Sequence, residues 1–354
     1  MRIALVTESF RPAADGTTTT VRALADRLVA DGHEVTFLAP GPGSESCRGS
    51  RVVRFRHRDP SGSQVREALA HLAPDLVHVA SPGPLGRKAL KHAHRLGIAT
   101  VVVEQSAVLD QTADYWRAKV AARADAVLVT SGWMVDRAEE LGVRAGLWSP
   151  GVDTATFAPR LRDPRLHRSW SRARSRSGPL VVVGHVGGLG SKHDVRRLAE
   201  LAAVPGIRPV ILGDGPHRGW LQGRLPGAAF TGELGPGDLG VALASLDVLV
   251  HPGEHETCAH ALRQAAASGV PVVAPRAGGA RDVVRHLESG LLYDPADLRG
   301  LPRAVAAVAG DPQRALLGER GRELAGLRSW DDAVEELVHE HYAKLVGRRV
   351  SAAA

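Results

Sequence analysis

The residues best suited to chemistry lie between positions 251 and 260. Asp247 and the apolar residues 248–250 predict a buried strand, and Pro252 and Gly253 end it because neither continues a strand interior. Residues 251–260 contain three histidines and two glutamates, and a helical pattern then runs to Gly269. Ligands of open α/β sheets bind at the carboxyl ends of the strands. The spacing therefore predicts a ligand site in this loop.

Single side chains of this loop allow more than one interpretation. Glu256 stands at the start of the predicted helix, where a carboxylate either compensates the helix dipole or contacts a ligand. His251, His255 and His260 straddle a loop and a helix without a second cluster in the sequence, so their spacing does not favour a metal site. Cys258 has no nearby base and is expected to be a packing residue, although a helix N-terminus lowers a thiol pKa.

Two glycine-containing loops could bring a phosphate close to the backbone. Asp15 and Gly16 precede a helix predicted over residues 17–30, whose free N–H groups and dipole favour phosphate. A plain N-cap turn explains the same two residues equally well. The glycines of residues 184–193 do not fit the dinucleotide fingerprint G-x-G-x-x-G, but they predict a loop without side-chain bulk that a ligand can approach.

Short apolar runs alternate with helical patterns along the 354 residues, which predicts parallel, doubly wound sheets. A fresh first strand at residues 180–183 restarts the pattern. The expected fold class is α/β, with two Rossmann-like domains whose carboxyl edges face each other across a central cleft. The predicted segments are an N-terminal domain, an Arg-rich linker, a C-terminal domain and a C-terminal helix, over residues 1–159, 160–178, 179–329 and 330–350.

The net charge of +7 is concentrated in the predicted linker, where residues 160–176 contain seven arginines and one aspartate. Aromatic residues make up only 4% of the chain, so no base-stacking platform for nucleic acid is visible. The arginines therefore indicate a solvated linker, with contact to an anionic membrane face or an acidic ligand as the alternative.

The cellular compartment is expected to be the cytoplasm, or the inner face of the membrane if the arginines contact lipid. Cys47 and Cys258 lie in different halves and form no metal-ligand pattern, as is usual in a reduced compartment. Apolar runs of four or five residues are too short to span a bilayer, and Glu8 interrupts the N-terminal run too early for a secretory signal.

A series of motifs, in order along nearly the whole chain, carries a family resemblance. They are Thr7-Glu8-Ser9-Phe10, Asp15-Gly16, Val77-His78-Val79-Ala80-Ser81-Pro82 with Leu85-Gly86, Ser149-Pro150-Gly151-Val152-Asp153 with Phe157, Gly213-Asp214-Gly215-Pro216, Phe230-Thr231-Gly232, His251-Pro252-Gly253-Glu254-His255-Glu256-Thr257 and Ala277-Gly278-Gly279. With these motifs the chain resembles the retaining GT-B glycosyltransferases that use nucleotide sugars, and among them the actinobacterial GDP-mannose-dependent α-mannosyltransferases.

The resemblance implies a hexosyltransferase that moves a sugar, mannose in the related branch, from a nucleotide sugar such as GDP-mannose to a lipid, glycan or small-molecule acceptor. It implies retention, no metal and no cofactor beyond the donor, with the diphosphate stabilised by backbone N–H groups, helix N-termini and cationic side chains. Glu256 is the catalytic residue by this resemblance, because it holds the donor sugar or stabilises charge near the anomeric carbon. The other implied site residues are Gly16, Gly187, Gly188, Lys192, His193, Gly213, Asp214, Thr257, Cys258, Ala259 and Gln264 on the donor, and Asp15, Gln105 and Ser106 on the acceptor side.

Three implied site positions depart from the family pattern. Gln264 stands where a second glutamate accepts from both ribose hydroxyls, and an amide lacks that charge-assisted strength. In the diphosphate loop Gly188 replaces an Arg and His193 replaces a Lys, while Lys192 stands where Glu is usual. His193 supplies a positive charge only when it is protonated. The loop at residues 105–107 lacks the acid that this branch carries.

These departures leave a second hypothesis from a different class, a catalytically impaired paralogue that binds nucleotide or a partner protein without transferring sugar. Each preorganised charge contact that is lost typically lowers a rate by about 100 to 1,000-fold. A third hypothesis, a sugar-nucleotide epimerase of the same fold, lacks support because no carboxylate constellation for proton abstraction is apparent.

Overall fold

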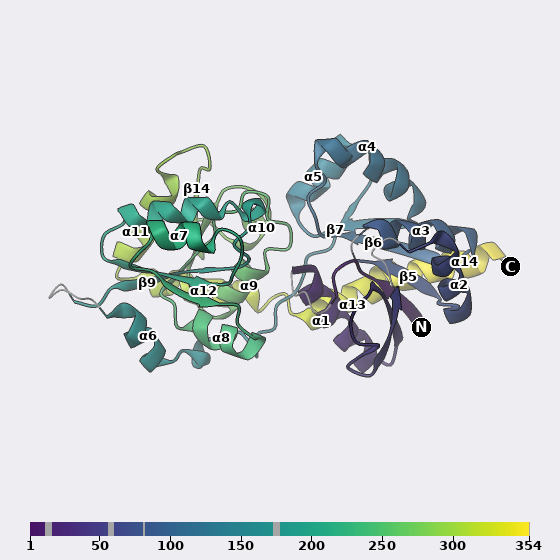
Figure 1. Cartoon of the computed structure of the whole chain (residues 1–354), viewed down its shortest axis with the longest axis horizontal. Coiled ribbons are helices and arrows are strands. Elements are labelled where there is room, and N and C mark those ends of the chain that lie inside the picture. Colours follow the sequence, from purple (N-terminus) through teal and green to yellow (C-terminus); the bar gives the residue numbers. More distant parts are fainter. Residues whose placement is uncertain (11–15, 56–59, 81, 173–177, 354) are drawn as a thin grey trace. The chain divides into compact units, whose positions relative to one another are not determined.

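The computed structural model describes residues 1–10, 16–55, 60–80, 82–172 and 178–353, which divide into two compact units (Figure 1). The first unit comprises Met1–Pro150 and Trp330–Ala354, and the second comprises Gly151–Ser329. Each unit is built on one sheet whose neighbouring strands are parallel, with one antiparallel pair at an edge of the first sheet. The α/β fold class predicted from the alternation of apolar runs and helical patterns is confirmed.

The first unit contains an eight-stranded sheet in the order β3-β4-β2-β1-β5-β6-β7-β8. Its strands are β1 (Arg2–Val6), β2 (Glu34–Pro40), β3 (Ser46–Cys47), β4 (Ser50–Phe55), β5 (Leu76–Val79), β6 (Ala99–Glu104), β7 (Ala126–Val129) and β8 (Gly146–Leu147). The connecting helices are α1 (Gly16–Ala30), α2 (Gly62–Leu72), α3 (Pro84–Arg95), α4 (Asp110–Lys119), η1 (Ala121–Arg123) and α5 (Gly132–Glu140). Strand β6 is buried along its whole length, because helices cover both faces of such a sheet.

The C-terminal segment belongs to the first unit. It consists of α13 (Trp330–Glu336), the π-helical turn η5 (Leu337–Tyr342) and α14 (Ala343–Ala353). Its apolar side chains, among them Leu337 and Tyr342, join the core formed by α1 and the strands of the first sheet. The buried indole of Trp148 also donates to the carbonyl of Ala333 across 2.8 Å, which fixes α13 in place.

The second unit contains a six-stranded parallel sheet in the order β11-β10-β9-β12-β13-β14. Its strands are β9 (Val181–Val186), β10 (Ile207–Leu212), β11 (Ala229–Gly232), β12 (Val248–Val250), β13 (Val272–Pro275) and β14 (Gly290–Tyr293). Its helices are η2 (Pro159–Leu161), α6 (Pro164–Ser171), η3 (Ser191–His193), η4 (Val195–Ala203), α7 (Arg218–Arg224), α8 (Pro236–Ala244), α9 (His260–Ala267), α10 (Ala280–Val283), α11 (Gly300–Gly310) and α12 (Arg314–Ala325). Separate apolar clusters use alternate residues of β9, β10 and β12, so both faces of this sheet are packed.

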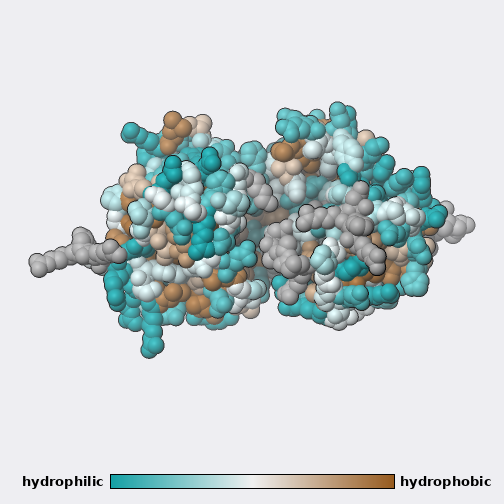
Figure 2. Space-filling model, viewed as in Figure 1, coloured by the Kyte–Doolittle hydropathy of each residue, from teal (hydrophilic) through white to brown (hydrophobic). Residues whose placement is uncertain are grey.

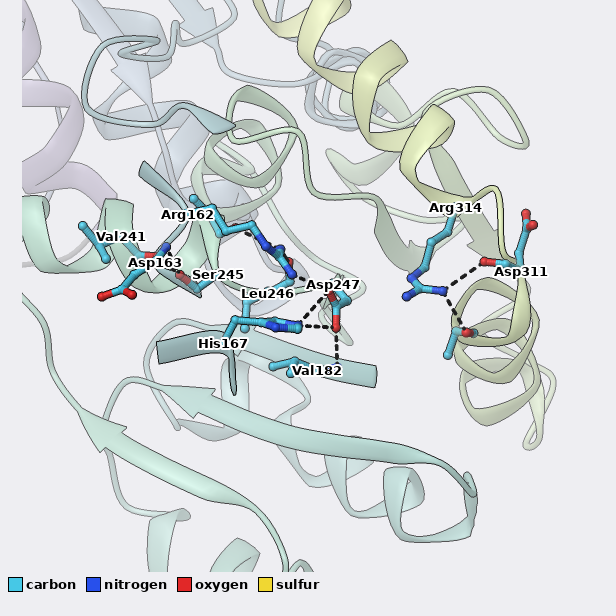
Figure 3. A network of polar contacts seen from close by, with 12 residues as sticks. Arg162, Asp163, His167, Val182, Val241, Ser245, Leu246, Asp247, Asp311 and Arg314 are labelled. Atoms are coloured by element: carbon cyan, nitrogen blue, oxygen red, sulfur yellow. Dashed lines mark hydrogen bonds and ion pairs between the residues drawn. The ribbon is translucent and has the colours of Figure 1, made fainter. Parts of the chain in front are cut away.

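Part of the segment predicted as a solvated linker is helical and packed. Asp163 caps α6, because its carboxylate accepts from the N–H groups of Arg165 and Leu166. Asp247, just before β12, accepts from Arg162 Nη2 at 2.8 Å, from His167 Nε2 at 2.9 Å and from Val182 N at 2.9 Å (Figure 3). These contacts attach α6 to the amino ends of β9 and β12. Residues 173–177 of the predicted linker lie outside the described residues.

The surface visible in Figure 2 is mainly hydrophilic, and the apolar side chains that reach it lie in small separate areas. Within the described parts of the chain, no helix combines the length and the apolar character needed to cross a membrane.

Candidate functional site

The loop that carries Glu256 and the glycine loop after β9 meet at one edge of the second sheet. The strand order reverses between β9 and β12, and ligands of doubly wound sheets bind beside the carboxyl ends at such a switch point. The loop after β9 contains Gly187 to His193, and the loop after β12 contains His251 to Ala259. The two loops touch, because Glu254 N donates to Asp194 Oδ2 across 3.1 Å.

Glu256 has both carboxylate oxygens engaged at this edge. Its Oε1 accepts from the N–H of Ala259, the residue before α9, across 3.1 Å. Its Oε2 lies 3.1 Å from His251 Nε2, at ion-pair distance but out of line with the ring N–H. The side chain is 17% exposed, so a ligand can still reach it.

The carboxyl of Glu256 is ionised at neutral pH. Burial by itself raises its pKa, but the contact with the His251 ring, the charges of His251 and His193 and the N–H of Ala259 together lower the pKa to about 2. A permanently charged carboxylate can accept from sugar hydroxyls or stabilise developing positive charge. It is not suited to protonating a leaving group, because a general acid needs a pKa near the working pH.

Glycines at the neighbouring strand ends allow the Glu256 loop to close. Gly278 has φ +53°, and a Cβ there would lie 2.6 Å from the carbonyl oxygen of Glu254 and 2.9 Å from the nitrogen of Glu256. The N–H of Gly279 donates to the carbonyl of Glu256 across 2.7 Å. The Gly278-Gly279 pair therefore supports the backbone that carries the carboxylate.

The loops after β9 and β10 approach each other through another pair of glycines. Gly213 has φ +145°, and a Cβ there would lie 2.1 Å from the carbonyl oxygen of Gly187. The Asp214 carboxylate accepts from its neighbour Gly215 and pairs with Arg218, and these contacts lower its pKa. These contacts place Asp214 in the turn after β10, and the donor contact that the resemblance implies for it stays a prediction.

A second histidine lies beneath His251. The rings of His185 and His251 stack with centroids 6.0 Å apart and planes 26° apart. His185 is 1% exposed, and its Nδ1 lies 3.2 Å from the carbonyl oxygen of Val250. Burial, helped by the charge of His251, lowers the pKa of His185 to about 3, so its ring is neutral. The sequence predicts that this strand ends at residue 183 and that His185 lies in the glycine loop, but β9 continues to Val186 and buries the His185 ring.

The other implied donor residues of the second unit lie at the same edge of its sheet. Thr257, Cys258 and Ala259 lead into α9, and Gln264 lies within that helix. Lys192 belongs to η3, and nothing is described of its side chain. No heavy atom of the described residues would lie within 4 Å of a Cβ on Gly188, so the loop has open space there.

The two arginines that follow the η3 loop have other contacts. Arg197 lies 3.0 Å from Glu200 and 3.8 Å from Glu254, and its guanidinium lies over the ring of Tyr293. Arg196 lies over the ring of Trp220. Arg197 is thus held within the fold, and no atom of either arginine lies within 4 Å of the position that a Cβ on Gly188 would take.

The implied acceptor-side residues belong to the first unit. Gly16, an implied donor residue, is also in the first unit as the first residue of α1, and Asp15 of the acceptor side lies outside the described residues. Gln105 is buried after β6 and donates to the carbonyl of Ala80 across 2.9 Å. Ser106 N donates to Glu104 Oε1 across 3.0 Å. Gln105 and Ser106 therefore lie at the carboxyl end of β6, and their acceptor-side role stays a prediction.

Glu104 is an acid in this loop that the resemblance did not single out. It is 3% exposed, and its Oε2 accepts from the indole of Trp116 across 2.9 Å. Burial raises its pKa, while the donors Ser106, Trp116 and Gln105 act in the opposite direction. Both oxygens are engaged, so Glu104 organises the loop between β6 and α4.

As for metals, the described residues contain no group of three or more His, Cys, Asp or Glu side chains that could hold an ion.

Two protein families match the chain, one for each sheet. Residues 14–156 match the family described as Glycosyltransferase Family 4, and residues 181–311 match that described as Glycosyl transferases group 1. The "GDP-mannose-dependent alpha-mannosyltransferase" of Mycolicibacterium smegmatis is 38% identical over 100% of both chains. A protein of the same name from Corynebacterium glutamicum is 34% identical over 98% of this chain and 89% of its own length.

Solved structures share the fold. The sucrose-phosphate synthase of Thermosynechococcus elongatus superposes with a TM-score of 0.81 over 100% of both chains, at 21% identity. The Anabaena protein Alr3699/HepE, solved in complex with UDP and glucose, has a TM-score of 0.80 over 98% of this chain and 100% of its own, at 18% identity. At these identities the likeness to the solved structures shows the fold alone.

Proposed function

The chain belongs to the glycosyltransferase family that includes the actinobacterial GDP-mannose-dependent α-mannosyltransferases, and we propose that it transfers mannose from GDP-mannose, with retention and without a metal ion. The observation that carries the proposal is an ionised carboxylate, Glu256, at the switch point of a chain 38% identical over its full length to such an enzyme. The acceptor class is a lipid, glycan or small molecule.

The donor is proposed to bind at the carboxyl edge of the second sheet. Its diphosphate would lie between the open loop at Gly187-Gly188 and the start of α9, where backbone N–H groups and the helix dipole favour an anion. Glu256 would face the sugar, and Gln264 the ribose. An ionised Glu256 stabilises the positive charge that develops at the anomeric carbon as the sugar–phosphate bond breaks.

The acceptor is proposed to approach from the first unit, through the loops that carry Gln105, Ser106 and Asp15-Gly16. In a same-face transfer, the acceptor hydroxyl forms the new bond to the anomeric carbon while the bond to the diphosphate breaks. The departing phosphate oxygen takes the hydroxyl proton, so no protein base is needed. This fits an edge where the acid near the acceptor side, Glu104, has both oxygens engaged.

Binding and turnover test the proposal together. Purified protein is mixed with GDP, GDP-mannose, UDP-glucose and UDP-N-acetylglucosamine, and thermal stabilisation is measured before GDP release is followed with candidate acceptors and chelator present. The expected result is stabilisation by GDP and GDP-mannose, and turnover that chelator does not abolish. No stabilisation by any nucleotide contradicts the proposal. The comparisons give no support to an impaired paralogue, and binding without turnover would be its signature.

Contact with an anionic membrane is the finer part of the proposal. Helix α6 is attached through Arg162 and His167, which leaves Arg165, Arg168 and Arg172 exposed around it. Clustered arginines bind anionic lipid with roughly 1 kcal/mol each near the surface. Co-sedimentation with phosphatidylglycerol vesicles is expected, and replacement of these three arginines by glutamine should abolish it. Equal binding of both proteins would contradict the membrane contact.

A further inference from the structure

The carboxylate of Glu256 rests on two histidines, His251 of the same loop and His185 of β9, to which the family resemblance assigns no role. His251 Nε2 lies 3.1 Å from Glu256 Oε2. The ring of His185 stacks on the ring of His251. Both histidines are nearly completely buried. Three ring nitrogens have no hydrogen-bond partner among the described residues, namely Nδ1 and Nε2 of His251 and Nε2 of His185, and the contact of His251 Nε2 with Glu256 is one of ion-pair distance only. A buried polar ring with an unpaired nitrogen is costly, which argues for a role beyond packing.

We propose that His251 is a positioning residue for the transfer reaction, which holds the Glu256 carboxylate in its ionised form and in one orientation, with His185 supporting the His251 ring. The inference rests on the proposed function, because it assigns Glu256 to the donor sugar. His251 itself need not touch the donor in this arrangement.

The groups around the Glu256 carboxylate favour its ionised form. Burial is the largest influence on Glu256 and opposes ionisation, and the groups that reverse it are His251 of the same loop, His193 of η3 and the Ala259 N–H at α9. His251 contributes through both its direct contact and its charge. His185 faces the cluster from β9 but is neutral. Removal of the His251 ring therefore takes away its direct contact and its charge, two influences that lower the pKa of Glu256, and Glu256 becomes easier to protonate.

The packing around His251 sets the orientation of its ring. A Cβ on Gly253 would lie 2.9 Å from His251 Nε2, so the absence of a side chain at that position leaves the ring room to face Glu256. His185 is fixed by the contact between its Nδ1 and the Val250 carbonyl, directly before His251 in the chain. The stacked rings and the glycine thus restrict His251 to the side where the carboxylate lies.

The experiment compares His251→Phe with His251→Asn, which restores a side-chain N–H donor, and with His94→Phe as a matched control on an exposed helix position of the first unit. The pH dependence of kcat and of KM for GDP-mannose is measured, with binding of GDP alone. For His251→Phe we expect kcat at about pH 6 to fall by about 10 to 100-fold relative to wild type, with partial recovery at about pH 8. GDP affinity should change by less than about 3-fold, because the proposed placement of the donor puts Glu256 at the sugar and not at the nucleotide.

His251→Asn should recover part of kcat, and His94→Phe should keep the wild-type profile. An unchanged pH profile in His251→Phe overturns the inference. An equal loss of GDP affinity in both His251 variants also overturns it, since that result means a structural role.

A spectroscopic readout separates the inference from the proposed function. Infrared difference spectra against Glu256→Gln report the ionisation of Glu256 without any turnover. Wild-type Glu256 should titrate with a pKa of about 2, and His251→Phe should titrate at a clearly higher pH. If GDP-mannose is not a substrate but this difference is seen, the proposed function fails and the coupling stands. If Glu256 titrates alike in both proteins, the inference fails whatever the substrate.

Discussion

The hydroxyl of Tyr342 lies 2.6 Å from Nδ1 of His78, although the residues are 264 positions apart in the sequence. Both side chains are completely buried, and their rings meet edge to face. The contact joins η5 of the C-terminal segment to β5 in the first sheet. Because burial keeps the His78 ring neutral, Nδ1 can accept a hydrogen bond from the Tyr342 hydroxyl.

Replacing Tyr342 with phenylalanine should weaken the first unit. The variant keeps the ring but leaves Nδ1 of His78 buried without its donor, which costs about 1–3 kcal/mol in the free energy of unfolding. Urea unfolding at neutral pH measures the difference. Tyr115→Phe is the control, because Tyr115 is 48% exposed and should change stability by no more than about 0.5 kcal/mol. Equal effects of the two substitutions would contradict a stabilising hydrogen bond at His78.

The buried histidines should make the protein sensitive to mild acid. Burial lowers the pKa of His78 and of His185 to about 3, whereas in the unfolded chain both take up a proton near pH ~6.5. Their contribution to stability is therefore complete above pH ~6.5 and is lost as the pH falls toward about 3. At pH ~5 the loss is about 2 kcal/mol for each histidine.

Unfolding free energies between about pH 8 and pH 5 measure this slope. His78→Gln should make the unfolding free energy depend less steeply on pH, because the contribution of His78 is gone. This holds whatever the variant does to stability at neutral pH. A slope that is identical in wild type and variant would mean that His78 titrates in the folded protein.

Strands and strand-end loops could be predicted because their signals are local. Residues 99–103 are apolar except for Thr100, and β6 is buried on both faces. The polar loop at 251–260 lies at the edge of the sheet where ligands of doubly wound sheets bind. The attachment of α6 could not be predicted. It depends on Asp247, a residue 85 positions from Arg162, which composition alone does not connect to an arginine-rich segment.

The candidate site was predictable to a similar depth. Glu256 followed from the loop and the family motifs. The contact of His185 with His251 did not, because it requires β9 to lie beside β12, a pairing of strands that are far apart in sequence. The same holds for Gly187 and Gly213, which meet because β9 and β10 are neighbours. Strand order at the switch point is therefore the information that the sequence did not reveal.

Gly213→Ala should disturb the candidate site. A Cβ would lie 2.1 Å from the carbonyl oxygen of Gly187, and φ +145° is strained for any residue with a side chain. The loops after β9 and β10 must separate, so we expect a loss of about 1–3 kcal/mol in stability and weaker GDP binding. Thermal unfolding and calorimetric titration with GDP measure both effects.

The control for Gly213 is Gly219→Ala in α7, where no heavy atom of the described residues would lie within 4 Å of the new Cβ. Alanine is favoured over glycine inside a helix, so stability should stay equal or rise by up to about 1 kcal/mol. If Gly213→Ala binds GDP as well as this control does, the two glycine loops do not form part of the donor site.

Gly188→Arg and Gln264→Glu should strengthen nucleotide binding by returning the two charges that the family pattern carries. A Cβ on residue 188 would meet open space among the described residues, so an arginine side chain fits and can pair with the diphosphate. A carboxylate at 264, on α9, would accept from the ribose hydroxyls with charge-assisted bonds, about twice as strong as those of the amide. Each change should tighten GDP binding by about 5 to 10-fold, which corresponds to about 1–1.4 kcal/mol.

Gly219→Arg is the matched control, because it adds the same charge to the same unit at another open position. Its GDP affinity should stay within about 2-fold of wild type at physiological salt, since a distant exposed charge is screened. Calorimetric titration of the three variants with GDP measures the differences. If Gly188→Arg binds GDP no better than Gly219→Arg, the diphosphate does not lie on the loop after β9, and the proposed placement of the donor is wrong. If only Gln264→Glu fails to tighten binding, the ribose lies away from α9 while the diphosphate placement stands.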